Sequence, residues 1–328
     1  MKNVLLIYIP CHKDFKSAIS QAKKIRKYYK GDTKLALQNS WEIKLILSVN
    51  DYLLKADQKK LANFYFDQVI DYGKIFLFDV NIMQGFLKAI EFKPDLLWIL
   101  STNDLVNTKS LETIFSDFGS DRKLDLLVAG SVTTKQEMKI SNIDSLFNSD
   151  YQFGLISGVV YNFQKFGKFF NAAPFFTWTG WGHLSVIINA IQARQEIFVS
   201  IVPRNCLFDP GPQSSNKNSK YYSHSYFGRL ILIQLINKSS NSRKREIRKF
   251  VYKNYYLHNY FNVLEKTTNL NSNLISSDNY LNFNKRLTCY IIKAQTPFTY
   301  FVFRILTVIN FTKLKKYSKY IGHKFKSA

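Results

Sequence analysis

The sequence predicts an α/β fold in which a mostly parallel, Rossmann-like sheet is flanked by helices and followed by a basic helical region. Two observations support this. Short apolar runs alternate with segments of helical periodicity through the first half of the chain, which is the pattern of a parallel sheet with right-handed crossovers. Polar residues follow three of the first four runs, as expected where strands end at a ligand-binding edge. The 328 residues, 46% of them hydrophobic, suffice for one large domain and an appendage.

The first strand and helix are defined by their end signals. Residues 4–10 form an apolar run that ends at Pro10. Residues 14–30 follow with apolar side chains at helical spacing, with Asp14 as the expected N-cap and Gly31 as the expected C-terminal stop.

The later elements follow the same alternation. A second strand over 43–49 runs into Asn50-Asp51, and Gly154 and Gly158 lie in a later strand, where glycine often marks close approach by a ligand or another backbone. The further strands expected are 74–79, 96–100, 124–130, 153–163 and 197–202, and the further helices are 55–66, 81–91, 109–118 and 184–194.

The net charge of +23 is unevenly distributed. Residues 1–150 hold 21 Lys and Arg against 18 Asp and Glu, whereas residues 151–328 hold 25 against 5. Acidic side chains that do chemistry are therefore expected in the first half, and the second half is expected to meet a negatively charged partner.

The cysteines and the apolar segments predict a cytoplasmic protein. Cys11, Cys206 and Cys289 are too few and too far apart for a disulfide framework or a CxxC zinc site. The N-terminal apolar run ends at Pro10 without a small-residue cleavage site, so we interpret it as a strand and not as a signal peptide. No run reaches the ~18 apolar residues that span a bilayer.

The most informative stretch is residues 95–106, where an apolar strand stops at a polar cluster that ends in Asp104. Ligands of open α/β sheets bind beyond the carboxyl ends of the strands, so this carboxylate is positioned to hold a metal or a sugar hydroxyl. The alternative is structural: Asp104 caps the helix that begins near Lys109, or closes a turn with Asn107.

Four landmarks in the first half carry a family resemblance. They are the proline turn at Pro10 to His12, the pair Asn50-Asp51, the expected helix start with Asn81 and Gly85, and the cluster with Asn103 and Asp104. In order and pattern, residues 2–210 resemble the inverting family 2 glycosyltransferases, which have the GT-A fold. The resemblance implies that a nucleotide-sugar is bound by Pro10, His12, Asn50, Asp51, Asn81 and Asn103.

The chain departs from the family at the metal site. Ser-Thr-Asn-Asp stands where the family has Asp-x-Asp, so only Asp104 is clearly kept. The resemblance implies a divalent ion, Mn²⁺ or Mg²⁺, that bridges two phosphates and neutralises the leaving diphosphate. One carboxylate suffices if the phosphates supply further ligands. The other possibility is that basic side chains replace the metal.

A second departure concerns the catalytic base. The family has an acidic base before a helix, but no carboxylate lies between Asp150 and Glu196. His183 is the one titratable side chain of the 176–184 loop, and we therefore expect it to accept the proton of the acceptor hydroxyl. The residues expected to contact the acceptor are Ser157, Trp178 and Trp181.

Several of these assignments have a structural alternative. In these alternatives, Asp51 caps the following helix and His183 packs against Trp181 at a helix start. Trp178 and Trp181 then lie in the core and do not contact a sugar. His12 beside Cys11 has no further metal ligands near it in the sequence.

Residues 213–328 are expected to form a basic helical region, for which three interpretations stay open. In the first interpretation, amphipathic helices lie on an anionic membrane, where each Lys or Arg contributes roughly 1 kcal/mol to binding. Alternatively, the charge binds nucleic acid, or it is the solvated face of a helical subdomain. The resemblance favours the membrane, because many bacterial relatives add sugars to lipid-linked glycans at its cytoplasmic face.

The sequence therefore predicts a nucleotide-sugar and acceptor domain over 1–212 and a membrane-associated region over 213–328. The expected function is transfer of a sugar, by inversion, from a nucleotide-sugar to a glycan or lipid-linked acceptor in bacterial surface polysaccharide synthesis. The alternative is a non-catalytic, degenerate transferase that binds glycans, or a basic nucleic-acid-binding protein.

Overall fold

The computed structural model describes most of the first two thirds of the chain. The described residues are 2–12, 14–31, 40–50, 53–72, 78–120, 123–141, 146, 153–176, 181–194 and 196–210. The chain divides into two compact units, residues 1–177 with 182–214, and residues 178–181 with 215–328. The predicted basic region over 213–328 lies outside the described residues, and its boundary near residue 212 stays a prediction.

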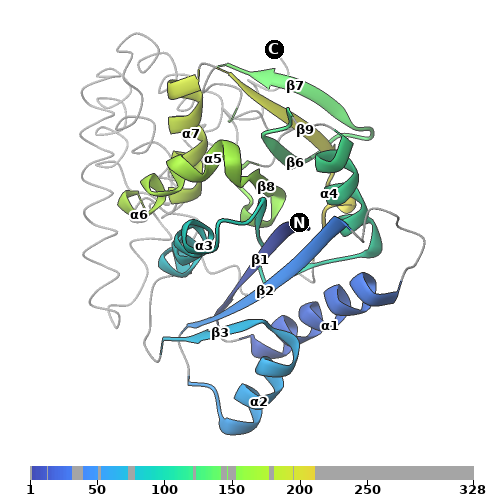
Figure 1. The fold of residues 1–328 in the computed structure, drawn as a ribbon, viewed down its shortest axis with the longest axis vertical. Helices are drawn as coiled ribbons and strands as arrows, with labels where there is room; N and C mark the ends of the chain where they lie inside the picture. The colour runs from blue at the N-terminus through green and yellow to red at the C-terminus, as the bar shows by residue number, and fades with distance from the viewer. Residues whose placement is uncertain are drawn as a thin grey trace, which may run out of the picture. The chain divides into compact units, whose positions relative to one another are not determined.

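A mixed sheet forms the centre of the first unit (Figure 1). The strands are β1 (Asn3–His12), β2 (Trp41–Asn50), β3 (Gln68–Asp71), β4 (Leu96–Ile99), β5 (Asp104–Leu105), β6 (Leu126–Gly130), β7 (Gln136–Ile140), β8 (Val159–Asn162), β9 (Ile197–Pro203) and β10 (Asp209–Pro210). The main sheet has 8 strands in the order β3-β2-β1-β4-β8-β6-β9-β7. Its first four strands run parallel, whereas β8 and β7 are antiparallel to their neighbours. A short second sheet pairs β10 with β5.

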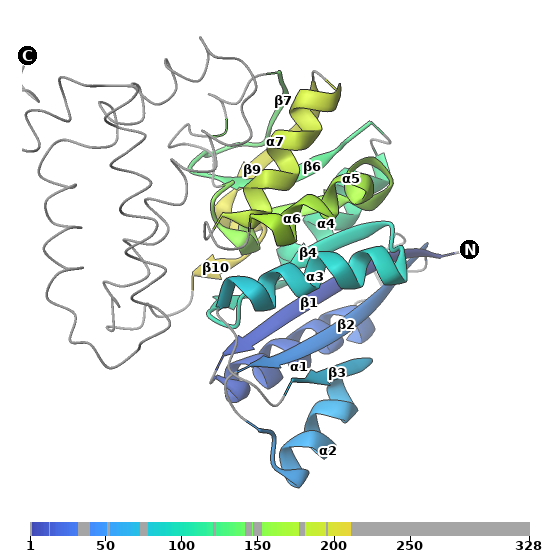
Figure 2. The same cartoon turned by 90° about the vertical axis from the view of Figure 1, so that its left-hand side faces the viewer.

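Helices cover both faces of the main sheet (Figure 2). They are α1 (Phe15–Gly31), α2 (Ala56–Tyr65), α3 (Phe78–Phe92), α4 (Thr108–Ser120), α5 (Phe163–Phe170), α6 (Ala172–Phe175) and α7 (Gly182–Arg194). Ile7 of β1 joins a buried cluster with residues of α1 and α4, such as Ala18 and Phe115. On the other face, Phe86 of α3 packs edge-on against Tyr161 of β8, with ring centroids 5.4 Å apart. The predicted α/β fold, a mostly parallel sheet flanked by helices, is confirmed for the described residues.

The predicted N-cap of the first helix is confirmed. The Asp14 carboxylate accepts a hydrogen bond of 3.1 Å from the Ser17 amide, which satisfies one of the free N–H groups of the first turn. Gly31 is the last residue of α1.

The predicted third strand at 74–79 is wrong at its end, at Phe78 and Asp79, and residues 74–77 lie outside the described residues. The edge strand β3 lies earlier in the chain, and Phe78 and Asp79 belong to α3. An apolar run of this length is compatible with a buried strand or a buried helix. From Phe78 onwards the chain is helical, with Ile82, Met83 and Phe86 buried at helical spacing.

The first strand does not end at Pro10, as predicted, but runs on to His12 beside β2. On its other side, pairing with β4 ends opposite Tyr8, whose carbonyl accepts a hydrogen bond from the Leu100 amide. Backbone groups two residues apart point to the same side of a strand, so the Pro10 nitrogen faces the β4 side beyond the end of that ladder. The missing N–H therefore breaks no ladder bond.

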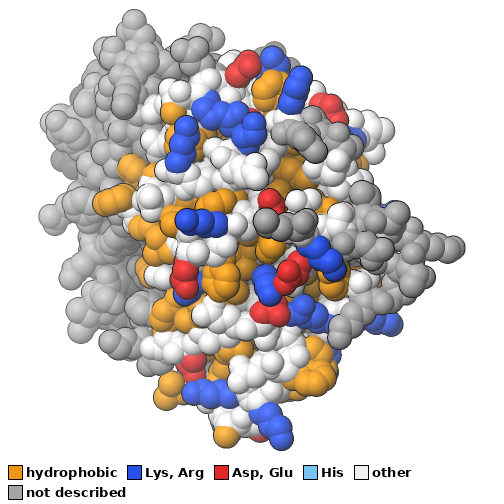
Figure 3. All heavy atoms as spheres, in the orientation of Figure 1, with side chains coloured by type: hydrophobic (Ala, Val, Ile, Leu, Met, Phe, Trp, Pro, Cys, Tyr) orange, Lys and Arg blue, Asp and Glu red, His pale blue; other side chains and the backbone are white. Residues whose placement is uncertain are grey.

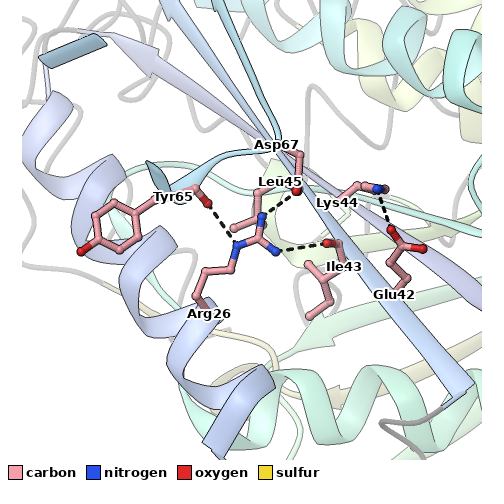
Figure 4. Close-up of polar contacts among 7 residues, drawn as sticks. All are labelled: Arg26, Glu42, Ile43, Lys44, Leu45, Tyr65 and Asp67. Atoms are coloured by element: carbon pink, nitrogen blue, oxygen red, sulfur yellow. Dashed lines mark hydrogen bonds and ion pairs between the residues drawn. The ribbon is translucent and has the colours of Figure 1, made fainter. Parts of the chain in front are cut away.

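Arg26 of α1 joins the helix to the β2–β3 edge of the sheet (Figure 4). Its guanidinium donates hydrogen bonds to the Tyr65 carbonyl at 3.1 Å, the Ile43 carbonyl at 3.3 Å and the Asp67 carboxylate at 2.7 Å. The same Asp67 oxygen accepts the Leu45 amide at 2.7 Å. The bonded guanidinium thus fixes α1 against the sheet, and Arg26 has a structural role.

Gly85 allows α3 to approach the sheet closely. A Cβ at this position would lie 2.9 Å from Cδ1 of Tyr8 and 3.0 Å from Cδ1 of Ile99. Gly85→Ala is expected to lower the free energy of unfolding by about 1–3 kcal/mol, because overpacking outweighs the better helix propensity of alanine. Urea denaturation measures this, with Gln84→Ala as the control that changes stability by less than about 0.5 kcal/mol. An unchanged midpoint in Gly85→Ala would contradict the close packing.

Candidate functional site

The polar turn after β4 is the candidate site. Strand β4 ends at Ile99, and the Asp104 amide donates a hydrogen bond of 3.2 Å to the Ser101 carbonyl, which closes the turn. Because β1, β2 and β4 are parallel, their carboxyl ends lie at the same edge of the sheet. That edge is where α/β sheets of this kind bind ligands.

The Gln21 side chain of α1 forms hydrogen bonds with the backbone on both sides of this turn. Its side chain is 1% exposed, donates a hydrogen bond of 3.4 Å to the Ser101 carbonyl and accepts one of 3.1 Å from the Val106 amide. Gln21 was not among the residues predicted from the sequence. The available signal was a polar side chain between Ala18 and Ala22 on the apolar side of the helix.

Ser157 orients the Asp104 carboxylate. Its hydroxyl oxygen accepts a hydrogen bond of 2.9 Å from the Ser101 amide, and its carbonyl accepts one of 2.9 Å from the Trp98 indole. Burial raises the pKa of Asp104, while the Ser157 hydrogen bond and the nearby Arg204 charge act in the opposite direction. The carboxylate is therefore partly desolvated, with the Ser157 hydroxyl and the Arg204 charge acting on it.

The structural alternative, in which Asp104 caps the next helix, is wrong. Asn107 directly precedes α4, and its Oδ1 accepts a hydrogen bond of 3.1 Å from the Ser110 amide. The Ser110 hydroxyl in turn accepts the Asn107 amide at 3.1 Å. This reciprocal pair caps α4 without Asp104.

Residues 204–210 pack against this turn. Strand β10 pairs with β5 so that Pro210 lies opposite Asp104. The Asn107 amide group donates hydrogen bonds of 3.0 Å to the Asn205 carbonyl and 3.0 Å to the Asp209 carboxylate. Neither Asp209 nor Arg204 was among the site residues predicted from the sequence.

The predicted nucleotide contacts lie at different depths. Asn50 is buried at the end of β2, opposite His12 of β1, and Pro10 is buried within β1. Asn103 is exposed in the turn beside the candidate carboxylate. Asp51 and the His12 side chain lie outside what the structure describes.

Asn81 is fully buried at the junction of three elements. Its Oδ1 accepts hydrogen bonds from the Tyr8 hydroxyl, at 3.0 Å, and from the Ser48 hydroxyl. Its Nδ2 donates one of 3.2 Å to the Ser48 carbonyl. These bonds join α3 to β1 and β2, so the structure gives Asn81 a positioning role and disfavours the predicted contact with a nucleotide.

The acceptor-side predictions fall on the segment before α7 and on the turn before β8. His183 is 5% exposed in the first turn of α7, and burial lowers its pKa to about 4, against the effect of a hydrogen bond with the Gly154 backbone. Ser157 follows Gly154 by three residues in the same segment and is 0% exposed. It acts on the Asp104 carboxyl group. Trp181 directly precedes α7, and Trp178 lies outside the described residues.

The low pKa of His183 makes stability depend on pH. The unfolded chain takes up the proton near ~6.5 and the folded one near 4, so stability is full above about pH 6.5 and falls as the pH is lowered. Between pH 7 and pH 5 the loss from this residue is about 2 kcal/mol. His183→Gln is expected to remove that part of the pH dependence, measured by urea denaturation at both values. An unchanged pH dependence in the variant would contradict the buried neutral imidazole.

The described residues do not form a metal site on their own. No group of three His, Cys, Asp or Glu among them is arranged to hold an ion. Asp104 has the Ser157 hydroxyl and the Arg204 cation as neighbours, and a guanidinium repels a dication at the same carboxylate. The expected Mn²⁺ or Mg²⁺ therefore fits this donor set poorly.

The fold resembles that of a solved transferase. A crystal structure of S. aureus TarS 1-349 in complex with UDP-GlcNAc matches with a TM-score of 0.54 and 9% identity, covering 87% of this chain and 80% of that one. The fold is of the GT-A type. The mannosyltransferase PcManGT from Pyrobaculum calidifontis, in complex with GDP-Man and Mn²⁺, matches with a TM-score of 0.46 and 6% identity over 98% and 85% of the chains, too weakly to support an argument. No family description and no curated sequence matches the chain.

Two surface properties bear on the expected partners. None of the helices within the described ranges combines the length and apolar character of a transmembrane span. On the face shown in Figure 3, Lys and Arg side chains of the described residues are scattered among apolar and acidic ones. The described residues on that face form no continuous basic patch of the kind that tracks a nucleic-acid backbone.

Proposed function

We propose that this protein is a glycosyltransferase that moves a sugar from a nucleotide-sugar donor to a glycan or lipid-linked acceptor. The observation that carries the proposal is Asp104, a partly buried carboxylate oriented by Ser157 at the ligand-binding edge of a GT-A-type sheet. The proposal does not require a second carboxylate or a metal cluster, because the Asp104 carboxylate can accept a hydrogen bond directly from a hydroxyl group of the donor sugar.

In the proposed reaction, an acceptor hydroxyl oxygen bonds to the anomeric carbon as the bond to the diphosphate breaks. The electron pair leaves with the nucleoside diphosphate, and the hydroxyl proton goes to a base. Attack from the opposite side inverts the anomeric centre. His183 is the proposed base, since it is neutral at pH 7, although its lowered pKa makes it a weak one.

The remaining roles follow from the predicted positions. Asn50 and Asp51 would meet the base or ribose, with Pro10, His12 and Asn103 along the same edge. Trp178 and Trp181 would stack on the acceptor sugar. The basic region over 213–328 would lie on the anionic inner face of the cell membrane, in bacterial surface polysaccharide synthesis.

Thermal-shift screening of the full chain with UDP-, GDP- and CMP-sugars, with Mn²⁺ and with EDTA, tests the proposal. A shift with one nucleotide class, together with sugar transfer or slow donor hydrolysis, is the expected result. Glycan binding without donor binding would favour the degenerate, non-catalytic alternative. Comparison of liposome flotation with binding to a nucleic-acid duplex, at one salt concentration, separates the membrane from the nucleic-acid interpretation.

A further inference from the structure

Arg204 is a cation at the candidate site that none of the described acids neutralises in a close ion pair. It opens the 3-10 turn Arg204–Cys206 directly after β9. Its guanidinium lies over the Phe208 ring, 5.0 Å from the centroid. Its buried Nε has no hydrogen-bond partner among the described residues. A buried donor without a partner costs free energy, so the unpaired Nε points to a ligand.

The backbone around Arg204 is rigidly held. The Arg204 carbonyl accepts hydrogen bonds of 3.0 Å from both the Leu207 and Phe208 amides. The Asn107 side chain binds the next carbonyl, and β10 pairs with β5 beside Asp104. The guanidinium is thus presented to the turn after β4 by a fixed frame, close enough for its charge to act on Asp104.

The chemistry of the leaving group explains a cation at this place. A nucleoside diphosphate gains negative charge as it leaves, and a site for it needs positive charge. A guanidinium matches two phosphate oxygens with its planar fork of N–H groups and keeps its charge at any physiological pH. The Phe208 ring restrains the side chain, which lowers the entropy lost on binding.

We propose that Arg204 binds the diphosphate of the donor and supplies the positive charge that a divalent ion supplies in metal-dependent transferases. The inference rests on the proposed function. Asp104 then holds no metal: it orients the guanidinium and accepts a hydrogen bond from the donor sugar. The presence of Ser-Thr-Asn-Asp in place of the family's Asp-x-Asp, with only Asp104 kept, is consistent with this exchange of a metal for a side chain.

The test is the affinity of the full chain for UDP and GDP, and for the corresponding monophosphates, measured by titration calorimetry in EDTA and in Mn²⁺. The wild type is expected to bind one diphosphate equally well in both. Arg204→Ala should weaken that diphosphate about 10- to 100-fold and the monophosphate much less. Arg204→Lys should recover part of the lost affinity, since it keeps the charge but lacks the planar fork of N–H groups. If the alanine variant is unstable, the lysine variant provides the test in its place.

The matched control is Lys139→Ala. Lys139 lies on β7 opposite Phe198, at the other end of β9 from Arg204, and forms an exposed pair with Glu196. This variant loses the same charge and should bind as the wild type does. Binding that requires Mn²⁺, with Arg204→Ala unaffected, would overturn the inference and leave the proposed function standing. No binding of any nucleotide or nucleotide-sugar by the wild type would remove both.

Discussion

Asp104→Asn should lower the turnover of sugar transfer about 100-fold, the typical loss when one preorganised electrostatic group of an active site is removed. The amide is nearly isosteric and still accepts a hydrogen bond from Ser157, so the turn after β4 should remain folded. What the variant loses is the negative charge that orients Arg204 and binds the donor sugar.

Two measurements make this expectation specific. Affinity for the nucleoside diphosphate in EDTA should not fall in Asp104→Asn, because the variant removes a negative charge that repels the two phosphates and the Phe208 ring still restrains Arg204. If a metal were bound at Asp104, the same variant would lose diphosphate affinity in Mn²⁺. Asp57→Asn, on the exposed first turn of α2, removes one carboxylate elsewhere and should leave turnover unchanged. Turnover near the wild-type value in Asp104→Asn would exclude this residue from the mechanism.

The parts of the fold that the sequence predicted are those with local signals. Strand β4 was recognisable from an apolar run with turn residues after it, and α1 from its apolar spacing and the Asp14 cap. Strand β3 was misplaced because Phe78 and its neighbours are equally compatible with a buried helix. Periodicity alone does not separate these cases in a short run.

The candidate site was predicted only in part, because its remaining residues come together through contacts far apart in the sequence. Asp104 followed from its position after a strand. Arg204 reaches it through pairing of two-residue strands about a hundred positions apart, which leaves no periodic pattern in the sequence. Gln21 acts from a neighbouring helix, and only its polarity on an apolar face marked it. Neither could be assigned before the sheet order was known.

Asp125 should be the largest single contributor to stability among the described acidic residues. It is 0% exposed just before β6, and its carboxylate accepts hydrogen bonds of 2.9 Å from both the Arg194 guanidinium and the Phe198 amide. Its backbone amide donates to the Phe198 carbonyl at 3.0 Å, and its carbonyl accepts the Asn162 amide at 3.0 Å. One residue therefore joins β6, β8, β9 and the end of α7.

Asp125→Ala is expected to lower the free energy of unfolding by about 3–5 kcal/mol, since it leaves a buried N–H and a partly buried cation without their acceptor. The Arg194 side chain is 23% exposed and can turn toward solvent, which favours the lower end of this range. Urea denaturation measures the loss. The double variant Asp125→Ala with Arg194→Met should cost less than the sum of the single variants, because it no longer strands a charge.

The exposed pair of Lys139 and Glu196 provides the comparison for Asp125. Its side chains are 57% and 47% exposed, so Glu196→Gln should cost less than about 1 kcal/mol. If Asp125→Ala and Glu196→Gln lowered the free energy of unfolding equally, the buried hydrogen bonds of Asp125 would add nothing to stability, which would contradict the role assigned to this residue. Additive losses in the double variant would show that the Arg194 contact is not coupled to the fold. The expected results are a large loss of stability in Asp125→Ala, and a loss in the double variant that is smaller than the sum of the two single losses.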